Sequence, residues 1–306
     1  MKKVFYFVQG LLIALTLLLV AALPTYAQQK PQWRSSLPSH HQVSTTPAKG
    51  IAAQKTALFK RLHQKSTIRY STSYQTFPSW SGYIVGDGNN QGYKGVEANW
   101  SGPCKTGTVN SQIQYGTWVG LGGVFKNEPL EQAGLILQSD GTYRLFWEYI
   151  SVNQPPYIDK NDVVHCGDSI TAWIHFGYSY CSNGGFYAHV QDNKTGAHLG
   201  STCLTESQGL GTLSAEWIDE RPLLTSCYNP AQLADFVTSN WSNVLAQANF
   251  GSASWLNPNN FPNAQELMYE QSTGIYLAYP DGLQVNSNNT FTDRWYAYGT
   301  YCYGGN

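Results

Sequence analysis

The sequence changes character at about Tyr74. From there to the C-terminus, short runs of aromatic and β-branched residues alternate with Gly, Asn and Pro, and helical patterns are nearly absent. Runs bounded by turn residues in this way are typical of strands. The predicted strands cover residues 80–86, 114–121, 131–138, 143–150, 168–176, 185–192, 214–220 and 275–280. About 230 residues are enough for one large core, so we expect a single all-β domain, a sandwich or a barrel, over residues 74–306.

The N-terminus has the features of an export signal. Lys2 and Lys3 precede a long apolar run, which ends in small residues at Ala27. This layout predicts a signal peptide over residues 1–27 and a secreted protein. The apolar run is long for a signal, and a lone N-terminal membrane anchor is the alternative. No later segment is apolar for long enough to span a bilayer, so we expect no membrane association after cleavage.

Charge is unevenly divided along the chain. Residues 28–73 contain eight Lys/Arg and no Asp or Glu, whereas residues 74–306 contain eight Lys/Arg and all 19 carboxylates, a difference of 11 negative charges. A basic segment ahead of an acidic body predicts a pro-segment or linker, with a short basic helix near residues 52–65. Nucleic-acid binding is the other interpretation of a basic arm, but an exported chain with an acidic body argues against it.

Six cysteines lie in the exported part of the chain, which predicts a disulfide framework and leaves all 15 pairings open. They are Cys104, Cys166, Cys181, Cys203, Cys227 and Cys302. His165, Cys166, His175 and Cys181 also suggest zinc, but they lack the close-paired Cys spacing of structural zinc sites. We therefore expect no metal and no cofactor.

Several catalytic motifs are missing, among them Gly-x-Ser-x-Gly, Asp-Thr/Ser-Gly and His-Glu-x-x-His. The glycine run at residues 120–124 is not followed by a helical pattern, so we expect a turn there and no phosphate site. Three polar residues instead stand in strand runs where apolar residues are expected: Gln132, Glu148 and Glu216. Strand edges often carry solvated Gln and Glu, which is the structural alternative for each of them.

Seven short motifs occur in one order along the chain. They are Trp-Ser-Gly-Tyr (80–83), Asn-Trp with a following Pro (99–103), Trp-Val-Gly-Leu-Gly-Gly (118–123), Gln-Ala-Gly (132–134), Trp-Glu-Tyr (147–149), Gly-Asp-Ser-Ile (167–170) and Ala-Glu-Trp-Ile-x-Glu-x-Pro (215–222). Each motif is weak by itself, but the ordered set resembles the glutamic peptidases, also called eqolisins. The resemblance covers roughly residues 74 to 250.

The resemblance implies a β-sandwich of two large antiparallel sheets, of the concanavalin or jelly-roll type, with a Gln/Glu dyad on the concave sheet. The glutamine of the family falls on Gln132 and its catalytic glutamate on Glu216, with Glu220 as the fallback for the glutamate. The tryptophans of the family's cleft fall on Trp80 and Trp118.

The family's secondary glutamate falls on Glu148. We assign Asp219 to the solvated neighbours of the acid cluster. The chain departs from the family pattern at Gly122 and Ile136, where acidic residues are usual. These departures put the pH optimum and the efficiency in question more than the type of reaction.

The resemblance implies a pepstatin-insensitive, acid-active endopeptidase that acts on proteins or peptides, most simply as a monomer. A glutamate near its ordinary pKa of about 4.3 can deprotonate water in acid, where a histidine is already protonated. A glutamine does not titrate, so its amide can donate to an oxyanion at any pH.

Two other functions stay open at this point. The first is a carbohydrate-active or carbohydrate-binding β-sandwich, either a lectin-like module or a glycosidase with Glu148 and Glu216 as paired carboxylates. This interpretation leaves Gln132 without a role. The second is a non-catalytic cell-surface module, which would account for the departures at Gly122 and Ile136.

Overall fold

The computed structural model describes residues 74–86, 92–107, 113–125, 128–150, 156–177, 181, 185–204, 213–224, 229–248, 254–261, 263–284 and 288–299. The chain divides into two compact units, Met1–Thr45 and Thr46–Asn306, and all of the described residues belong to the second. The predicted signal peptide and the predicted basic segment lie outside the described residues.

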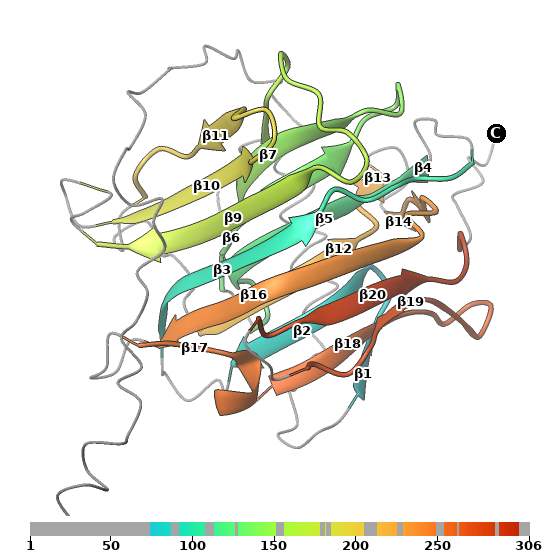
Figure 1. Ribbon diagram of the computed structural model, residues 1–306. Coiled ribbons are helices and arrows are strands. Elements are labelled where there is room, and N and C mark those ends of the chain that lie inside the picture. Colours follow the sequence, from blue (N-terminus) through green and yellow to red (C-terminus); the bar gives the residue numbers. More distant parts are fainter. Residues whose placement is uncertain are drawn as a thin grey trace, which may run out of the picture. The chain divides into compact units, whose positions relative to one another are not determined.

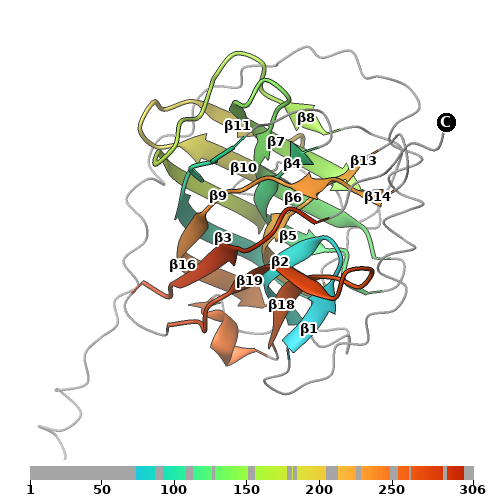
Figure 2. The same ribbon diagram turned by 90° about the vertical axis from the view of Figure 1, so that its right-hand side faces the viewer.

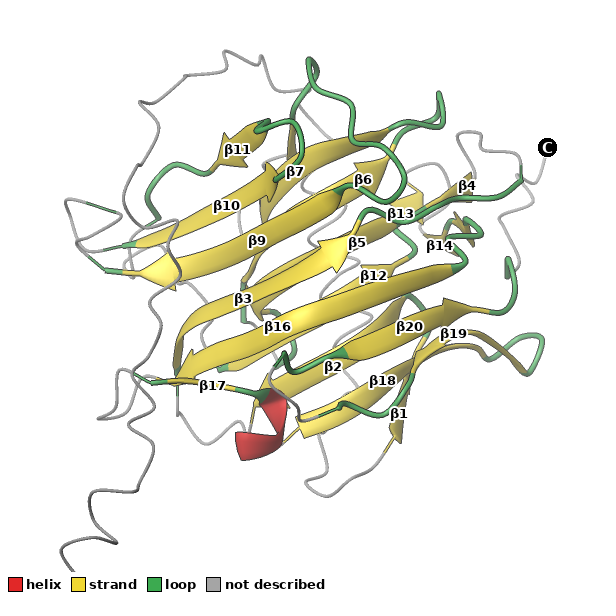
Figure 3. Ribbon diagram, in the orientation of Figure 1, coloured by secondary structure: helices red, strands yellow, loops and turns green. Residues whose placement is uncertain are grey.

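The described residues are built almost entirely of strands (Figure 3). The strands are β1 (Tyr74–Phe77), β2 (Trp80–Gly86), β3 (Tyr93–Ser101), β4 (Ile113–Gln114), β5 (Gly116–Gly122), β6 (Leu130–Leu137), β7 (Tyr143–Ile150), β8 (Tyr157–Ile158), β9 (Ser169–Phe176), β10 (Phe186–Asp192), β11 (His198–Gly200), β12 (Ser214–Glu220), β13 (Leu223–Leu224), β14 (Asn229–Pro230), β15 (Gln232–Leu233), β16 (Thr238–Ala248), β17 (Trp255–Leu256), β18 (Asn263–Glu270), β19 (Ile275–Pro280) and β20 (Phe291–Trp295). One helical turn, η3 (Pro258–Asn260), joins β17 to β18.

One long hydrogen-bonded sheet runs in the order β11-β10-β9-β3-β16-β20-β19-β18-β2-β12-β5-β6-β7-β8. It folds over on itself, so that β10, β9, β3 and β16 form one layer and β2, β12, β5, β6 and β7 form the other (Figures 1 and 2). Strands β20, β19 and β18 join the two layers along one side. The expected β-sandwich with antiparallel sheets is therefore confirmed.

The main core lies between the two layers, because each strand alternates its side chains between the two faces of its sheet. Ala215 and Trp217 of β12 point into this core together with Val96 and Ala98 of the facing strand β3. The Trp217 indole reaches across the core and donates to the backbone carbonyl of Glu97, at 3.0 Å. A second, smaller apolar cluster lies on the outward face of the β2-β12-β5-β6-β7 layer.

The predicted strands all occur, with ends that shift by at most a few residues. The prediction missed β3, β16 and β18, where polar residues such as those in TSNWSNVLAQA interrupt the apolar pattern. Residues 230–236, between the predicted strands, contribute to two short pairings, β13 with β14 and β15 with β4, ahead of β16. The turn expected at residues 120–124 was placed too early, because β5 continues to Gly122.

Two disulfides are present in the described part of the chain, Cys104–Cys166 and Cys181–Cys203. Cys227 and Cys302 lie outside it. No helix in the described part of the chain is long and apolar enough to span a membrane.

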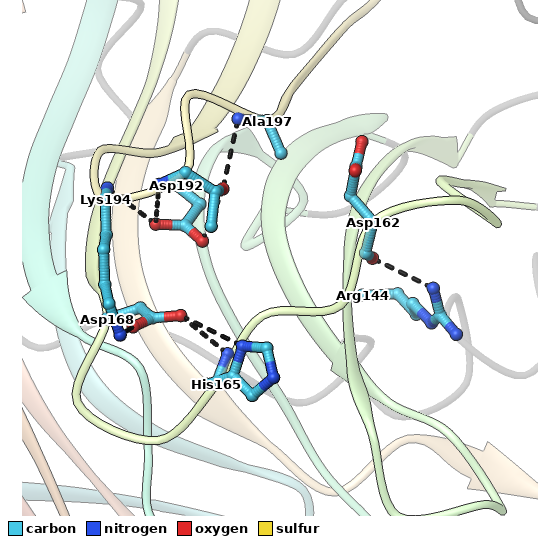
Figure 4. A network of polar contacts seen from close by, with 8 residues as sticks. Arg144, Asp162, His165, Asp168, Asp192, Lys194 and Ala197 are labelled. Carbon is cyan, nitrogen blue, oxygen red and sulfur yellow. Dashed lines mark hydrogen bonds and ion pairs between the residues drawn. The ribbon is translucent and has the colours of Figure 1, made fainter.

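The loop before β9 and the turn after β10 are held together by an ion pair (Figure 4). The Lys194 ammonium donates to the Asp168 carboxylate at 2.7 Å, and the backbone N–H of His165 donates to the same carboxylate at 2.8 Å. Burial raises the pKa of Asp168, but the hydrogen bonds and the charge of Lys194 outweigh it and hold the pKa below its ordinary value. This network is structural and lies in loops away from the outward face of β5 and β12.

Candidate active site

Three of the polar residues singled out in the sequence lie in one row across four strands. Glu216 of β12 is paired with Gly120 of β5, Gly120 with Gln132 of β6, and Gln132 with Glu148 of β7. Residues that are directly opposite on neighbouring strands have side chains on the same face of the sheet. The row therefore brings Glu216, Gln132 and Glu148 together on the outward face of this layer, with the glycine between the first two.

Gln132 and Glu216 are both buried, with 3% and 0% of their surface exposed. The Gln132 amide nitrogen donates to Oε2 of Glu148 at 2.9 Å, which fixes the orientation of the amide. Among the described residues, neither the amide oxygen of Gln132 nor either carboxyl oxygen of Glu216 has a hydrogen-bond partner. Buried acceptors without donors are costly to a fold, so three of them on one face mark a site for chemistry.

Gly120 leaves the space over β5 open between the two side chains. A methyl group at this position would lie 2.9 Å from Oε2 of Glu216 and 2.6 Å from a ring atom of Trp118. The carboxyl group of Glu216 therefore leans over β5, in the direction of the strand that carries Gln132. The absence of a side chain at Gly120 is what allows this approach.

Burial raises the pKa of Glu216 well above its ordinary value, and the charge of Glu128 adds to the increase. The nearby Ser214 hydroxyl offsets part of it. The expectation that Glu216 titrates near its ordinary value is therefore wrong for the full chain. A buried carboxyl group resists ionisation because its charged form is poorly solvated.

The two tryptophans of the motif set lie beside this row. Trp80 and Trp118 are buried and meet edge to face, with ring centroids 5.1 Å apart. The Trp118 indole donates to Oε2 of Glu220 at 2.8 Å. Glu220 is paired with Gly116, four residues along the strands from the Gln132 row, and its hydrogen bond holds Trp118 in place.

Comparison with known proteins gives the family of the chain. The sequence model of the peptidase A4 family matches residues 78–275.

The chain belongs to the peptidase A4 family.

It is a glutamic-type endopeptidase by this assignment. Its fold is similar to that of scytalido-glutamic peptidase with a transition state analog inhibitor, with a TM-score of 0.57, 17% identity and coverage of 72% of this chain and 98% of that chain. It is also similar to SCP-B, a member of the eqolisin family in a complex with the tripeptide Ala-Ile-His, with a TM-score of 0.54, 18% identity and the same coverage, 72% and 98%. No protein with a curated description matches the sequence.

One carboxyl group near the row of Glu216, Gln132 and Glu148 was not identified from the sequence. Glu128, between β5 and β6, accepts hydrogen bonds from the backbone N–H groups of Leu213 at 2.6 Å and Phe125 at 3.1 Å. Burial raises its pKa to about 7, and its charge acts on Glu216. No periodic signal marks a loop residue of this kind. It supplies a carboxyl group near the dyad in a chain that has Gly122 and Ile136 where the family usually has acids.

The assignment of Asp219 to the solvated neighbours is wrong. Asp219 is fully buried on the inward face of β12, where it accepts hydrogen bonds from the hydroxyl groups of Tyr115 and Ser239 and from the Trp241 indole. The strand period explains the error, because residues 216 and 219 lie on opposite faces. No group of three or more metal-ligating side chains was found within the described ranges, where Cys166 and Cys181 are in disulfides.

Proposed function

We propose that this protein is a secreted, acid-active endopeptidase in which Glu216 is the general base and Gln132 stabilises the oxyanion. The observation that carries the proposal is the set of unpartnered acceptor atoms on Gln132 and Glu216, which stand on either side of Gly120 in one row of the sheet. A water molecule held there can donate one hydrogen to the Glu216 carboxylate and the other to the Gln132 amide oxygen. The first of these hydrogen bonds favours the ionised carboxylate, and so it opposes the rise in the pKa of Glu216 that burial causes and keeps part of the base ionised in acid.

Peptide hydrolysis then follows from these two side chains. Glu216 takes a proton from the water as its oxygen attacks the carbonyl carbon of the substrate. The Gln132 amide nitrogen has two hydrogens, one of which goes to Glu148, so that the second can donate to the oxyanion. Glu216 returns its proton to the leaving nitrogen as the C–N bond breaks. The products are a carboxylic acid and an amine, and the dyad is restored.

The outward face of β5 fits an extended peptide. Its residues on this face are Gly116, Trp118, Gly120 and Gly122, so a substrate backbone can come close to the strand on either side of one aromatic ring. In this proposal Trp80 and Trp118 form the apolar wall of the substrate groove. Glu220 holds Trp118, and Glu148 orients the catalytic amide.

Maturation is part of the proposal, because a basic segment precedes the acidic domain in the sequence. We propose that residues 1–27 are removed on export and that the basic segment, residues 28–73, inhibits the acidic domain until it is released in acid. Opposite charges attract near neutrality, and the attraction fades as carboxylates are protonated. A separate 28–73 peptide should inhibit the 74–306 domain at pH 6 and fail to inhibit it at pH 3. Equal inhibition at both pH values would contradict this mode of control.

One assay tests the reaction. The secreted protein is incubated at pH 2 to 6 with a denatured protein substrate in the presence of pepstatin, and in parallel with β-glucans. We expect pepstatin-resistant proteolysis that is lost in Gln132→Ala and in Glu216→Gln. Proteolysis that survives both substitutions would exclude the dyad, and release of sugars by the wild-type protein would favour the carbohydrate interpretation.

The carbohydrate interpretation has less support from the geometry. Glycosidase carboxyl groups stand about 5–10 Å apart across the scissile bond. Glu148 and Glu216 lie on strands three apart, with a backbone separation of about 14 Å, and the Gln132 side chain stands between them.

A further inference from the structure

Four fully buried polar residues form a closed set between the two layers of the sandwich. Asp219 of β12 and Ser81 of β2 are neighbours in one layer, and Asp293 of β20 and Ser239 of β16 are neighbours at the other. Each serine donates to the aspartate opposite: the Ser81 hydroxyl to Asp293 at 2.9 Å and the Ser239 hydroxyl to Asp219 at 2.8 Å. The two aspartates are called here the carboxyl pair. The hydrogen bonds from Ser81 and Ser239 link their strands across the core.

The two members of the carboxyl pair have different surroundings. Both carboxyl oxygens of Asp219 accept hydrogen bonds, from Tyr115 and Ser239 on one and from the Trp241 indole on the other. Asp293 accepts through one oxygen only, and its Oδ2 has no donor among the described residues. Asp219 is therefore the member built to hold a negative charge. Asp293 has a free oxygen on which a proton can sit and donate to Asp219.

Among the described residues, the groups that act on the carboxyl pair do not include a cation. The Arg294 guanidinium, next to Asp293 in sequence, binds Asp281 at the surface, at 2.8 Å. The other titratable side chains described near the pair or near its tyrosine partner are phenols and a carboxyl group: Tyr115, Tyr143 and Asp235. Burial raises the pKa of Tyr115, so that its hydroxyl group stays a neutral donor. Two adjacent buried carboxylates cannot both be ionised without such a cation.

We propose that Asp219 and Asp293 share one proton and form a pH lock, which holds the two layers together in acid and releases them as the pH rises. This lock acts on the fold and is independent of the proposed dyad. It would confine the protein to acid even if Glu216 were able to work at neutral pH.

The direction in which stability changes with pH follows from the number of protons that the folded and unfolded states bind. Burial, and then the charge of Asp219, raise the pKa of Asp293 well above its ordinary value. Below the unfolded value of about 3.9, both states hold the protons and the pair stabilises the fold fully. As the pH rises, the unfolded chain releases protons that the folded chain keeps. The folding equilibrium constant then falls about tenfold per pH unit for each proton kept, until the folded pair also loses its proton.

The variant Asp293→Asn tests the lock in the full secreted chain. The asparagine amide can donate to Asp219 as the shared proton does, and it needs no protonation. We expect the midpoint of unfolding on raising the pH to move upward by about one unit or more, with an unchanged melting temperature at pH 4. The slope of the logarithm of the folding constant against pH should fall by about one proton.

Two further variants complete the test. Asp281→Asn changes an exposed carboxyl group beside the same strand and should leave the midpoint where it is. Asp219→Asn sets an amide nitrogen against the Trp241 indole, which can only donate, or against the Tyr115 and Ser239 hydroxyls, which must turn to accept. It should lower the melting temperature at every pH. The lock is refuted if Asp293→Asn and the wild-type protein unfold at the same pH. It is also refuted if Asp293→Asn fails to fold at pH 4, because the amide should then replace the bond of the shared proton.

Discussion

Strand β12 carries buried carboxyl groups on both of its faces, and these groups differ in their hydrogen-bond partners. On the inward face, Asp219 accepts hydrogen bonds from Tyr115, Ser239 and Trp241. On the outward face, three residues away, Glu216 is equally buried and has no donor among the described residues. Burial alone therefore does not separate a structural acid from a reactive one. Between these two residues the difference lies in the hydrogen bonds that they accept from described residues: Asp219 accepts three, and Glu216 accepts none.

The difference has an energetic meaning. A buried polar group that is left without a partner destabilises a fold by about 1–3 kcal/mol, and more when it is charged. Glu216 therefore destabilises the peptidase A4 domain, and the proposed catalytic role would account for its retention there. Asp219 contributes to stability, because its donors would otherwise be the unsatisfied groups. Substitutions on the two faces should consequently separate activity from stability.

The largest expected effect is the loss of activity in Glu216→Gln. Removing a general base slows hydrolysis by about 10²–10⁴-fold. The melting temperature should stay the same or rise, since an amide is easier to bury than a carboxyl group that has no donor. Initial rates on a denatured protein and thermal unfolding at the same pH check both parts. A marked fall in melting temperature would show that Glu216 has a structural partner.

A substitution on the inward face should reduce stability and leave the activity almost unchanged. Asp219→Ala leaves the Trp241 indole without an acceptor and removes the carboxylate that accepts from both the Tyr115 and Ser239 hydroxyls. It should lower the free energy of unfolding by about 3–5 kcal/mol. The activity per folded molecule should change little, because Asp219 does not face the groove. Denaturant unfolding at pH 4 measures the loss of stability. Initial rates divided by the concentration of active sites, from active-site titration, give the activity per folded molecule. A stable but inactive variant would place Asp219 in the chemistry after all.

Gly120→Ala tests the open space between the dyad residues. The added methyl group would lie 2.6 Å from Trp118 and 2.9 Å from the Glu216 carboxyl group, so that one of them must move. Misplacement on this scale should lower kcat/KM by about 10–100-fold. Gly116→Ala is the matched control on the same strand and face, because its methyl group would have its nearest contact at an ordinary 3.6 Å. Equal rates in the two variants would mean that Gly120 does not shape the site.

Much of this fold can be read from the sequence, because apolar alternation and turn residues mark most strands directly. The missed strand β16 shows the limit. Asn240, Ser242 and Asn243 are exposed or half-buried and Ser239 is buried although polar, so the apolar alternation is hidden. The dyad residues stand out as polar positions in strands, and the resemblance gives them roles. Their alignment over Gly120 depends on the register of three strands, which no local pattern encodes.

Asp219 shows a different kind of failure. The period of two places it on the same face as Trp217 and away from Glu216, so its inward direction could have been predicted. Its partners could not, since Ser239 and Asp293 follow 20 and 74 residues later in the chain. A carboxyl group in an acidic cluster looks solvated until the partners that bury it are known.

The smallest expected effect concerns the ion pair of Asp168 and Lys194, whose pH dependence should be opposite to that of the carboxyl pair. The lowered pKa of Asp168 means that the ion pair stabilises the fold above the unfolded value of about 3.9 and ceases to do so as the pH falls through the folded value. Lys194→Ala should thus lower the melting temperature at pH 6 and have almost no effect at pH 2.5. The loss at pH 6 should stay below about 1 kcal/mol, since the Lys194 side chain is 67% exposed and solvent screens the pair.

Lys160→Ala, at an exposed lysine of the loop before β9, is the control and should change the melting temperature at neither pH. A penalty for Lys194→Ala that is the same at both pH values would show that Lys194 acts through packing, and the contrast between the two acid networks would then be lost.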